Sequence, residues 1–399
     1  MTLKDICELI VDCPHVTDND EGFGYPLIRT PNVGKGILLL ENVHRVSKDV
    51  YDRRNRRAKP QPGDLILARE APAGNVALIR EGQEVCLGQR TVLIRPNKKL
   101  VVPEFLTYYL LAPYSQHRIK QSANGSTVEH VNMPNIRGLK TELPTLHVQK
   151  EIASILSNYD TLININTKRI KLLEESAREL YKEWFARMRF PGYEKAKFVK
   201  GIPVGWDVKT IDEICDSVGG GTPSTSNANY WGGKIKWVTP TDITSKQSLP
   251  LINIEGRITE AGLRQSSTKL LPAGAILMTS RASIGFFGIC KEQVCTNQGF
   301  ISIIPNEENL RMYMLCNLMM RREEIISNAN GATFLEISKG RFRKMEMLIP
   351  NNDVLSAFEE RCSTTFDAVY NLEIQNQNLA ATRDRILPRL LSGELKVKA

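Results

Sequence analysis

The sequence predicts a mixed α/β (α+β) protein with two globular domains separated by two long antiparallel helices that form a coiled coil. Three observations support this fold class. The 399-residue chain matches itself in order at offsets of 206–211 residues. Each copy begins with short strand-like runs between turn signals. Each copy ends in a long segment with a helical apolar pattern. The sequence therefore predicts a pseudo-twofold tandem repeat.

The repeat is visible in short segments that stay in the same order. Residues 2–7 (TLKDIC) match residues 210–215 (TIDEIC), residues 63–67 match 274–278, and residues 124–127 match 330–333. The offset between matching segments changes only by a few residues, the length of a loop insertion. Chance matches would not keep the same order and nearly the same offset. A period of this length is too long for a solenoid, so we infer two copies of a whole module.

The expected elements follow from this division. Short apolar runs predict strands, and longer periodic runs predict helices in between. The expected strands are residues 64–68, 91–95, 235–239, 275–279 and 300–304, and the expected helices are 103–121 and 307–327. The predicted domains are 1–145, a central helix 146–190, a linker 191–205, a second domain 206–350 and a C-terminal helix 351–399.

The two long helices carry apolar residues seven positions apart. This spacing is typical of a coiled coil, in which a polar residue on the seam fixes the register. Asn166 or Asn376 would have that role. The predicted pairing residues are Ile152, Tyr159, Asn166, Leu173 and Leu180 on the first helix, and Leu372, Leu379 and Ile386 on the second. The alternative is two ordinary helices on separate cores.

Composition indicates a folded protein of the cytoplasm. Hydrophobic residues make up 42% and charged residues 24%, both typical of globular chains. The charge of +9 is distributed along the chain and fits a polyanion partner, although many basic proteins bind nothing anionic. Charged residues lie where the apolar region of a signal peptide would be, so we do not expect export. No apolar run is long enough to span a membrane, so we do not expect a membrane partner. The eight cysteines form no CxxC pair, which argues against zinc.

No catalytic motif is present in the sequence. A GxxxxGK[ST] loop, a GxGxxG turn and a GxSxG elbow are all missing, as are the tetrapeptide of amino-methyltransferases and the acidic motif of metal-dependent nucleases. We therefore expect no cofactor or metal in this chain and no independent enzyme. A catalytic DNA methyltransferase or nuclease with unrecognised motifs remains the alternative.

Basic and polar residues near turns suggest nucleic-acid binding. Arg53, Arg54, Arg56 and Arg57 form a basic loop suited to phosphates, although a solvated charge run is the simpler alternative. Polar residues at strand ends could contact base edges, or could act only as caps and turn residues. These candidates are Arg29, Thr30, Asn32, Arg69, Gln89 and Arg90 in the first copy, and Thr222, Ser224, Thr239, Thr241, Ser280, Arg281, Asn297 and Gln298 in the second.

Several of these segments resemble a known family. Residues 220–226 (GGTPSTS), 237–243 (WVTPTDI), 280–285 (SRASIG) and 296–300 (TNQGF) are similar to the target recognition domain of type I restriction-modification specificity subunits. Residues 144–156 and 390–395 (LLSGEL) resemble the spacer regions of that family. The first copy departs from the pattern, with residues 12–15 (DCPH) and 27–31 (LIRTP) in place of GGTPS and WVTP.

The resemblance implies a non-catalytic subunit. Each recognition domain would read one half of a bipartite site in double-stranded DNA. The helices would set the spacing and dock two methyltransferase subunits, and restriction/translocase subunits would join. S-adenosylmethionine, ATP and Mg would be bound only by these partners, in a complex that methylates adenine at N6 and cleaves DNA with ATP. The specificity module of another phage-defence complex is a close alternative.

Overall fold

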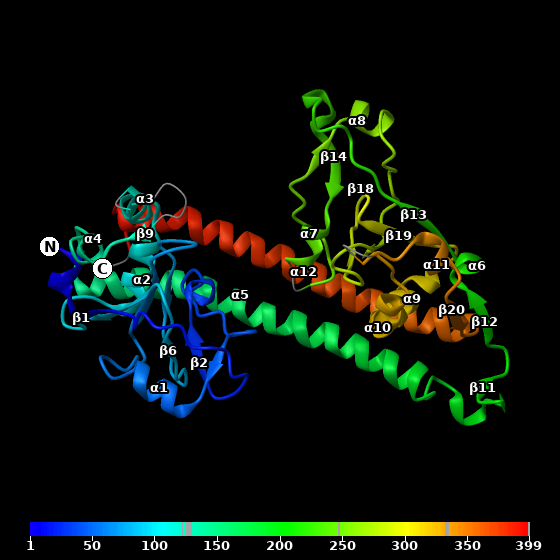
Figure 1. Ribbon diagram of the computed structural model, residues 1–399, viewed down its shortest axis with the longest axis horizontal. Coiled ribbons are helices and arrows are strands. Elements are labelled where there is room, and N and C mark those ends of the chain that lie inside the picture. Colours follow the sequence, from blue (N-terminus) through cyan, green and yellow to red (C-terminus); the bar gives the residue numbers. More distant parts are fainter. Residues whose placement is uncertain (122, 125–129, 246–247, 332–334, 398–399) are drawn as a thin grey trace. The chain divides into compact units, whose positions relative to one another are not determined.

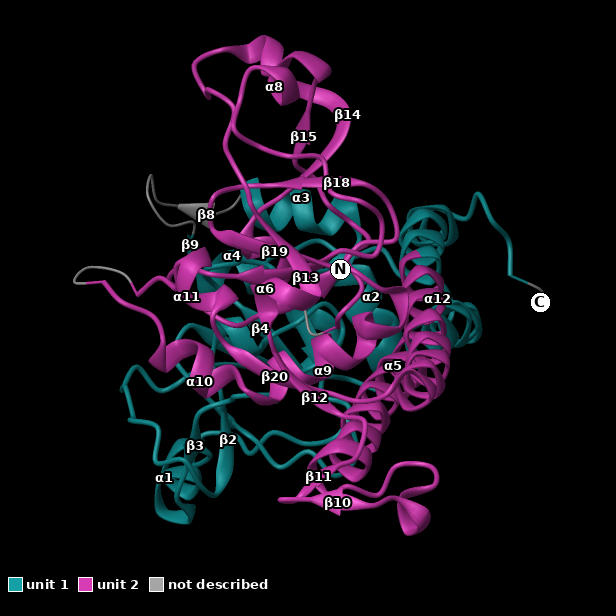
Figure 2. Cartoon of the chain, turned by 90° about the vertical axis from the view of Figure 1, so that its right-hand side faces the viewer, with its two compact units in different colours: residues 1–162, 378–399 teal, residues 163–377 magenta. Residues whose placement is uncertain are grey.

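The computed structural model describes residues 1–121, 123–124, 130–245, 248–331 and 335–397 (Figure 1). The chain divides into two compact units, coloured separately in Figure 2. Unit 1 contains Met1–Leu162 and Asn378–Ala399, and unit 2 contains Ile163–Gln377. Helices α5 (Leu146–Tyr181) and α12 (Asn352–Leu391) each cross this division. Each unit therefore consists of a globular part and one segment of both long helices.

Unit 1 contains two sheets of three or four strands, and β8 (Ala123–Asn124) pairs with β9 (His130–Val131) in a further two-stranded sheet. The first is antiparallel with the order β1 (Cys7–Asp12), β7 (Thr91–Pro96), β4 (Leu65–Ala68) and β5 (Val76–Leu78). The second has the order β3 (Arg45–Val46), β2 (Tyr25–Ile28) and β6 (Cys86–Leu87), with β2 and β6 parallel. The other elements are α1 (Lys48–Arg54), α2 (Pro103–Leu111), α3 (Pro113–Gln121) and α4 (Met133–Arg137).

Unit 2 repeats this topology. Its sheets have the orders β13 (Cys215–Gly219), β19 (Phe300–Pro305), β16 (Ile276–Thr279), β17 (Phe287–Ile289), and β15 (Arg257–Ile258), β14 (Trp231–Val238), β18 (Val294–Thr296). In the three-stranded sheet, the central strand β14 is again parallel to β18, as β2 is to β6 in unit 1. Ala68 pairs with Thr91 in unit 1, and Thr279 pairs with Phe300 in unit 2. The tandem repeat is thus confirmed strand by strand.

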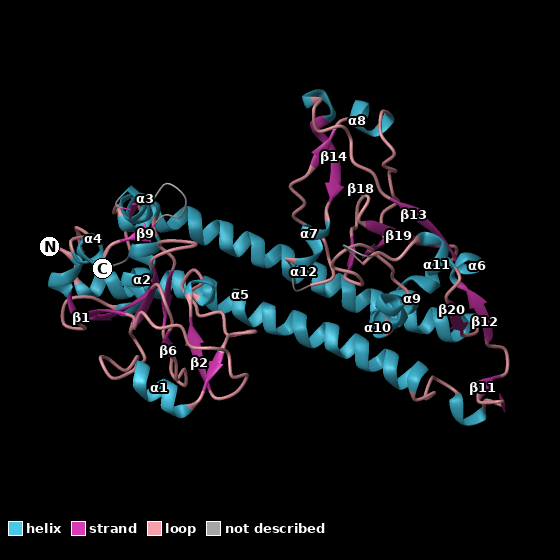
Figure 3. Ribbon diagram, viewed as in Figure 1, coloured by secondary structure: helices cyan, strands magenta, loops and turns pink. Residues whose placement is uncertain are grey.

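The remaining elements of unit 2 are short, as Figure 3 shows. They are β10 (Phe198–Val199), β11 (Ile202–Pro203), β12 (Asp207–Thr210), β20 (Glu346–Ile349), α6 (Ile211–Ile214), α7 (Pro240–Thr244), α8 (Glu260–Arg264), α9 (Arg311–Met320), α10 (Arg322–Ser327) and α11 (Lys339–Arg343). β10 and β11 form a hairpin inside the segment that the sequence predicted as a linker.

The central strands are buried on both faces. Leu65 and Leu67 pack in one apolar cluster with α2, whereas Ile66 and Ala68 pack in another. Successive side chains of a strand point to opposite faces, so a strand with core on both sides is apolar throughout. Unit 2 repeats the arrangement, with Met278 on one side and Leu277 on the other.

The expected helix 103–121 is interrupted at one residue. α2 ends at Leu111 and α3 begins at Pro113. Proline has no backbone N–H and disfavours helical geometry in the residue before it, so Ala112 is extended. The expected helix 307–327 also divides, into a 3-10 turn (Glu308–Leu310), α9 and α10.

The long helices pack against each other in antiparallel fashion within each unit. In unit 1, Ile152 shares a cluster with Leu390, and in unit 2 Ile170 shares a cluster with Val369. In the π-helical turn Lys182–Ala186 that follows α5, the ring centroid of Trp184 lies 5.7 Å from that of Phe358. Positions on α12 fall as those on α5 rise, so the two helices run in opposite directions.

The predicted pairing residues lie on this seam or beside it. Ile152, Asn166 and Leu372 are buried, whereas Tyr159, Leu173, Leu180, Leu379 and Ile386 are half-buried. Asn166 donates a hydrogen bond from Nδ2 to Gln375 Oε1 of the facing helix at 2.8 Å. Only a register that brings these two residues together satisfies the buried amide. Among the described residues, no helix is long and apolar enough to cross a membrane.

Candidate nucleic-acid interface

Four motif segments of the second copy meet in unit 2. The Gly221 N–H donates to Thr296 O at 2.9 Å, and Trp237 Nε1 donates to Gly221 O at 3.0 Å. The Asn297 N–H donates to Val238 O at 3.1 Å, which continues the parallel pairing of β14 and β18. The Ser280 N–H donates to Gly299 O at 2.8 Å. Residues 219–222, 239–241, 280–281 and 297–299 thus form one surface, the unit 2 strand-end surface.

The paired glycines of this surface have a packing role. A Cβ on Gly220 would lie 2.0 Å from Asn297 O, and one on Gly221 would lie 2.3 Å from Ser267 Oγ. No side chain fits at either position without movement of the backbone. The GG motif therefore lets three chain segments approach closely, which agrees with the absence of a phosphate-binding loop.

Five predicted contact residues have exposed side chains in unit 2: Thr222, Ser224, Thr241, Arg281 and Gln298. Thr222 Oγ1 donates to Gln298 Oε1 at 2.5 Å, which orients the amide and leaves its N–H groups available. Ser224 Oγ lies 2.8 Å from Ser226 Oγ. These groups supply the donors and acceptors that base edges require.

Three other predicted residues of unit 2 have structural roles. Thr239 Oγ1 donates to Asp242 Oδ2 at 2.8 Å and begins α7. Asn297 Oδ1 accepts from the Gly299 N–H at 2.9 Å and shapes the turn after β18. Ser280 is buried. These hydrogen bonds and this burial support the shape of the surface.

The same arrangement exists in unit 1. The Gly88 N–H donates to Ile28 O at 2.7 Å, and the Arg69 N–H donates to Arg90 O at 2.8 Å. Residues 29–30, 69–70 and 88–90 thus form the unit 1 strand-end surface. Gln89 Nε2 donates to Thr17 Oγ1 at 2.7 Å, and Arg90 is exposed. Arg29 and Thr30 are half-buried.

Three residues predicted to contact nucleic acid in unit 1 have intramolecular partners: Arg69, Arg54 and Asn32. Arg69 donates to Asp12 at 2.7 and 2.8 Å, to Val131 O at 2.8 Å, and lies 2.6 Å from His130 Nε2. Arg54 is 4% exposed and donates to Asp18 and Leu87 O.

Asn32 is the third residue, and it closes its own loop. Its Nδ2 donates to Leu39 O at 3.3 Å, and its Oδ1 accepts from the Arg29 N–H at 3.1 Å. Burial of a charged or amide group requires such partners. The sequence pattern alone does not separate these buried polar residues from exposed ones.

The basic loop divides into paired and unpaired residues. Arg53 forms an ion pair with Asp18. Arg56 and Arg57 are exposed, and no hydrogen bond or ion pair joins either guanidinium to another residue of the described part of the chain. These two side chains are the strongest candidates for contact with phosphates.

A charged cluster that the sequence did not predict lies beside the unit 1 surface. Glu70 Oε1 lies 2.5 Å from His130 Nδ1 and 3.0 Å from Arg90 Nη1. His15 Nε2 lies 3.3 Å from Asp12 Oδ2. The partners of Glu70 come from distant segments, so the sequence contains no local signal for this cluster.

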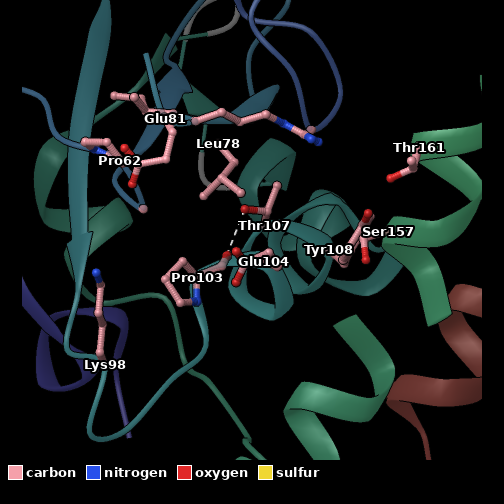
Figure 4. A pocket seen from close by; sticks show the side chains of 14 residues that line it. Pro62, Leu78, Glu81, Lys98, Pro103, Glu104, Thr107, Tyr108, Ser157 and Thr161 are labelled. Atoms are coloured by element: carbon pink, nitrogen blue, oxygen red, sulfur yellow. Dashed lines mark hydrogen bonds between the residues drawn. The ribbon is translucent and has the colours of Figure 1, made fainter. Parts of the chain in front are cut away.

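A cavity of 740 Å³ lies elsewhere in unit 1 (Figure 4). Lys98, Glu104 and Tyr108 line it from the globular part, and Ser157 and Thr161 line it from α5. None of the predicted contact residues borders this cavity, so we do not assign DNA contact to it.

The described residues contain no cluster of three or more His, Cys, Asp or Glu side chains that could hold a metal ion. The eight cysteines are thiols, and seven of them are buried. Burial raises the pKa of Cys316 and that of Cys215 to about 12, so both thiols are protonated and poorly nucleophilic at neutral pH.

The family described as "Type I restriction modification DNA specificity domain" matches residues 1–175 and 203–381. The two matched segments correspond to the two copies and include most of both long helices. The chain belongs to this family.

Relatives of this specificity-domain protein are themselves specificity subunits. The type I restriction enzyme MjaIX specificity subunit of Methanocaldococcus jannaschii is 35% identical over 180 residues, which is 45% of this chain and 42% of that protein. The HindI specificity subunit of Haemophilus influenzae is 22% identical, and the match covers 93% of this chain and 95% of that protein. The chain thus spans less than half of the first relative and nearly all of the second.

The fold is also found in a solved structure. The crystal structure of a type I restriction-modification S subunit from M. genitalium matches with a TM-score of 0.58 and 14% identity, over 98% of this chain and 95% of that one. At this identity the match establishes a shared fold. It agrees with the two repeated globular parts and the long helices described above.

Proposed function

We propose that this chain is the non-catalytic DNA specificity subunit of a type I restriction-modification complex. Each strand-end surface would read one half of a bipartite site in double-stranded DNA. The observation that carries the proposal is the duplication of that surface, once in each unit, on a chain whose units share two paired helices. A protein with two such surfaces would bind two separated half-sites.

The side chains of both surfaces support DNA as the ligand. The exposed hydroxyl, amide and guanidinium groups in unit 2 match the donors and acceptors of the major groove. Arg56 and Arg57 would neutralise backbone phosphates beside the unit 1 surface. The alternative of a catalytic DNA methyltransferase or nuclease is not favoured, since the relatives of similar length are named specificity subunits.

The partners follow from the same proposal. Two methyltransferase subunits would dock on the long helices, and restriction/translocase subunits would complete the complex in the cytoplasm. S-adenosylmethionine, ATP and Mg would be bound by these subunits. The register fixed by Asn166 and Gln375 would keep the distance between the half-sites constant.

The deciding experiment maps N6-methyladenine across the genome of a host that expresses this chain with its methyltransferase subunits. We expect a bipartite motif with a constant gap. Exchange of residues 1–145 for the corresponding domain of another specificity subunit should change one half of the motif and keep the other. Methylation that is unaffected by the exchange would contradict the proposal, as would methyl transfer by the chain alone.

A second experiment tests the phosphate contacts. Each lost contact should reduce the slope of log K against log salt by about 0.9. The double variant Arg56→Gln/Arg57→Gln should therefore lower the slope by about 1.8 and weaken binding equally for all sequences. Arg385→Gln, an exposed arginine of α12 outside the surface, is the control and should leave the slope unchanged.

A further inference from the structure

The two units carry a charged pair at the same structural position. Glu70 lies two residues after the end of β4, and Arg281 lies two residues after the end of β16. Their partners are also equivalent, because His130 pairs with Asn124 and Glu336 bridges Asn330, each at an offset of 206. The position that holds a carboxylate in unit 1 thus holds a guanidinium in unit 2.

Despite this exchange, each unit places one exposed arginine beside a carboxylate. In unit 1, Arg90 Nη1 lies 3.0 Å from Glu70 Oε1, and the Arg90 side chain is 49% exposed. In unit 2, Arg281 Nε lies 3.9 Å from Glu336 Oε2, and the Arg281 side chain is 50% exposed. The two arginines come from different turns, so the arrangement is retained although the residues are not.

Each guanidinium keeps one edge with two N–H donors. Arg90 faces its carboxylate through Nη1, which leaves the edge formed by Nε and Nη2. Arg281 faces its carboxylate through Nε, which leaves the edge formed by Nη1 and Nη2. In the major groove, O6 and N7 of guanine are the acceptor pair that fits such an edge. A neighbouring carboxylate reduces the freedom of the arginine before binding.

The backbone of Arg90 indicates that its side chain is kept for function. Its φ is +63°, in the left-handed region that disfavours residues with a Cβ. The equivalent position in unit 2 is Gly299, because Thr91 and Phe300 occupy the same register beside β4 and β16. Glycine would relieve the strain at this turn, so an arginine is not required for folding there.

We propose that Arg90 and Arg281 each read a guanine in their half-site, and that Glu70 and Glu336 are the positioning residues that hold the two guanidiniums. This inference rests on the proposed function and adds to it the base class that each unit recognises. It also assigns a role to two glutamates that lie outside every motif of the sequence.

The test compares the methylation motifs of hosts carrying the complex with the wild-type chain, Arg90→Gly or Arg281→Lys. Arg90→Gly reproduces the residue of unit 2 and should unfold at no lower denaturant concentration than the wild type. Arg281→Lys keeps the charge and removes the two-donor edge. Each variant should lose selection for one G·C pair in one half of the motif, a loss of about 5- to 150-fold in discrimination between matched duplexes.

The positioning role of the two glutamates is tested by measuring the base preference of glutamate variants of the complex. Glu70→Ala and Glu336→Ala should weaken selection at the same G·C pair as the variant of the neighbouring arginine. Glu70→Gln and Glu336→Gln, which keep an acceptor in place, should restore part of it. Alanine variants that leave the base preference unchanged would refute the positioning role.

Three outcomes separate the hypotheses. A wild-type complex without sequence-specific methylation would overturn the proposed function. A wild-type bipartite motif that Arg90→Gly and Arg281→Lys leave complete would overturn only the guanine inference. Equal weakening on all duplexes, with a smaller salt slope, would show that the arginines contact phosphates and would also overturn it.

Discussion

The replacement of Arg383 by methionine should destabilise unit 1, because it leaves a buried carboxylate without its cation. Arg383 of α12 forms an ion pair with Asp160 of α5, and the Tyr108 hydroxyl of α2 donates to Asp160 Oδ2 at 2.5 Å. The side chains of Arg383 and Asp160 are 16% and 11% exposed. One carboxylate thus joins three helices of the unit.

The size of the effect follows from this burial. Exposed ion pairs contribute about 0.2–1 kcal/mol, whereas removal of one partner of a buried pair costs about 3–5 kcal/mol. The Tyr108 hydroxyl still donates to Asp160 in the variant, which favours the lower end. We therefore expect the free energy of unfolding of unit 1 to fall by about 3 kcal/mol. At a urea slope of about 2 kcal/mol/M, the midpoint shifts by about 1.5 M.

The assay can separate the two units. The four tryptophans (Trp184, Trp206, Trp231 and Trp237) lie in unit 2, so their fluorescence reports that unit. The rate of amide hydrogen exchange in peptides from α2 reports the opening of unit 1. Arg383→Met should accelerate exchange in α2 more than it shifts the fluorescence transition.

The matched control is Arg385→Met, an exposed arginine on the same helix, which should change stability by less than about 0.5 kcal/mol. The double variant Arg383→Met/Asp160→Asn should recover most of the loss, since no charge remains buried and the amide oxygen still accepts from the Tyr108 hydroxyl. A cost below about 1 kcal/mol for Arg383→Met would refute the assignment of this pair as buried. A double variant as unstable as the single one would refute the reasoning from an unpaired charge.

Three other predictions concern unit 2. Burial raises the pKa of Glu174, so this carboxyl contributes most stability below its unfolded pKa of 4.5 and less as pH rises. Glu174→Gln should therefore gain stability relative to the wild type as the pH is raised above 4.5 in urea titrations. Gly220→Ala sets a Cβ 2.0 Å from a backbone oxygen and should cost about 1–3 kcal/mol and weaken DNA binding, whereas Gly340→Ala, with no atom within 4 Å, should be neutral by the same measurements. Phe358→Ala removes a fully buried ring and should lower the fluorescence-detected unfolding free energy by about 3–5 kcal/mol, and an equal effect of the exposed Phe198→Ala would contradict this.

Apolar periodicity and the internal repeat were sufficient to predict the architecture. The seven-residue spacing on the long helices reflects the geometry of two packed helices, so it predicted the pairing of α5 and α12 and a polar residue at Asn166. The buried strands β4 and β16 were predicted for the same reason, because a core on both faces requires continuous apolar residues. The interruption before Pro113 was not predicted, because the apolar pattern continues across it and a single helix was expected over 103–121.

The duplication, the long helices and the segments that form the two strand-end surfaces follow from the amino-acid sequence alone. Which polar residues of those segments are exposed depends on the folded structure. Arg54 and Arg69 are held by carboxylates and carbonyl groups far away in the sequence, whereas Arg90 and Arg281 keep free donors. The type of a residue determines which groups its side chain can bind. The partners that it actually contacts come from distant segments, which only the folded chain brings together.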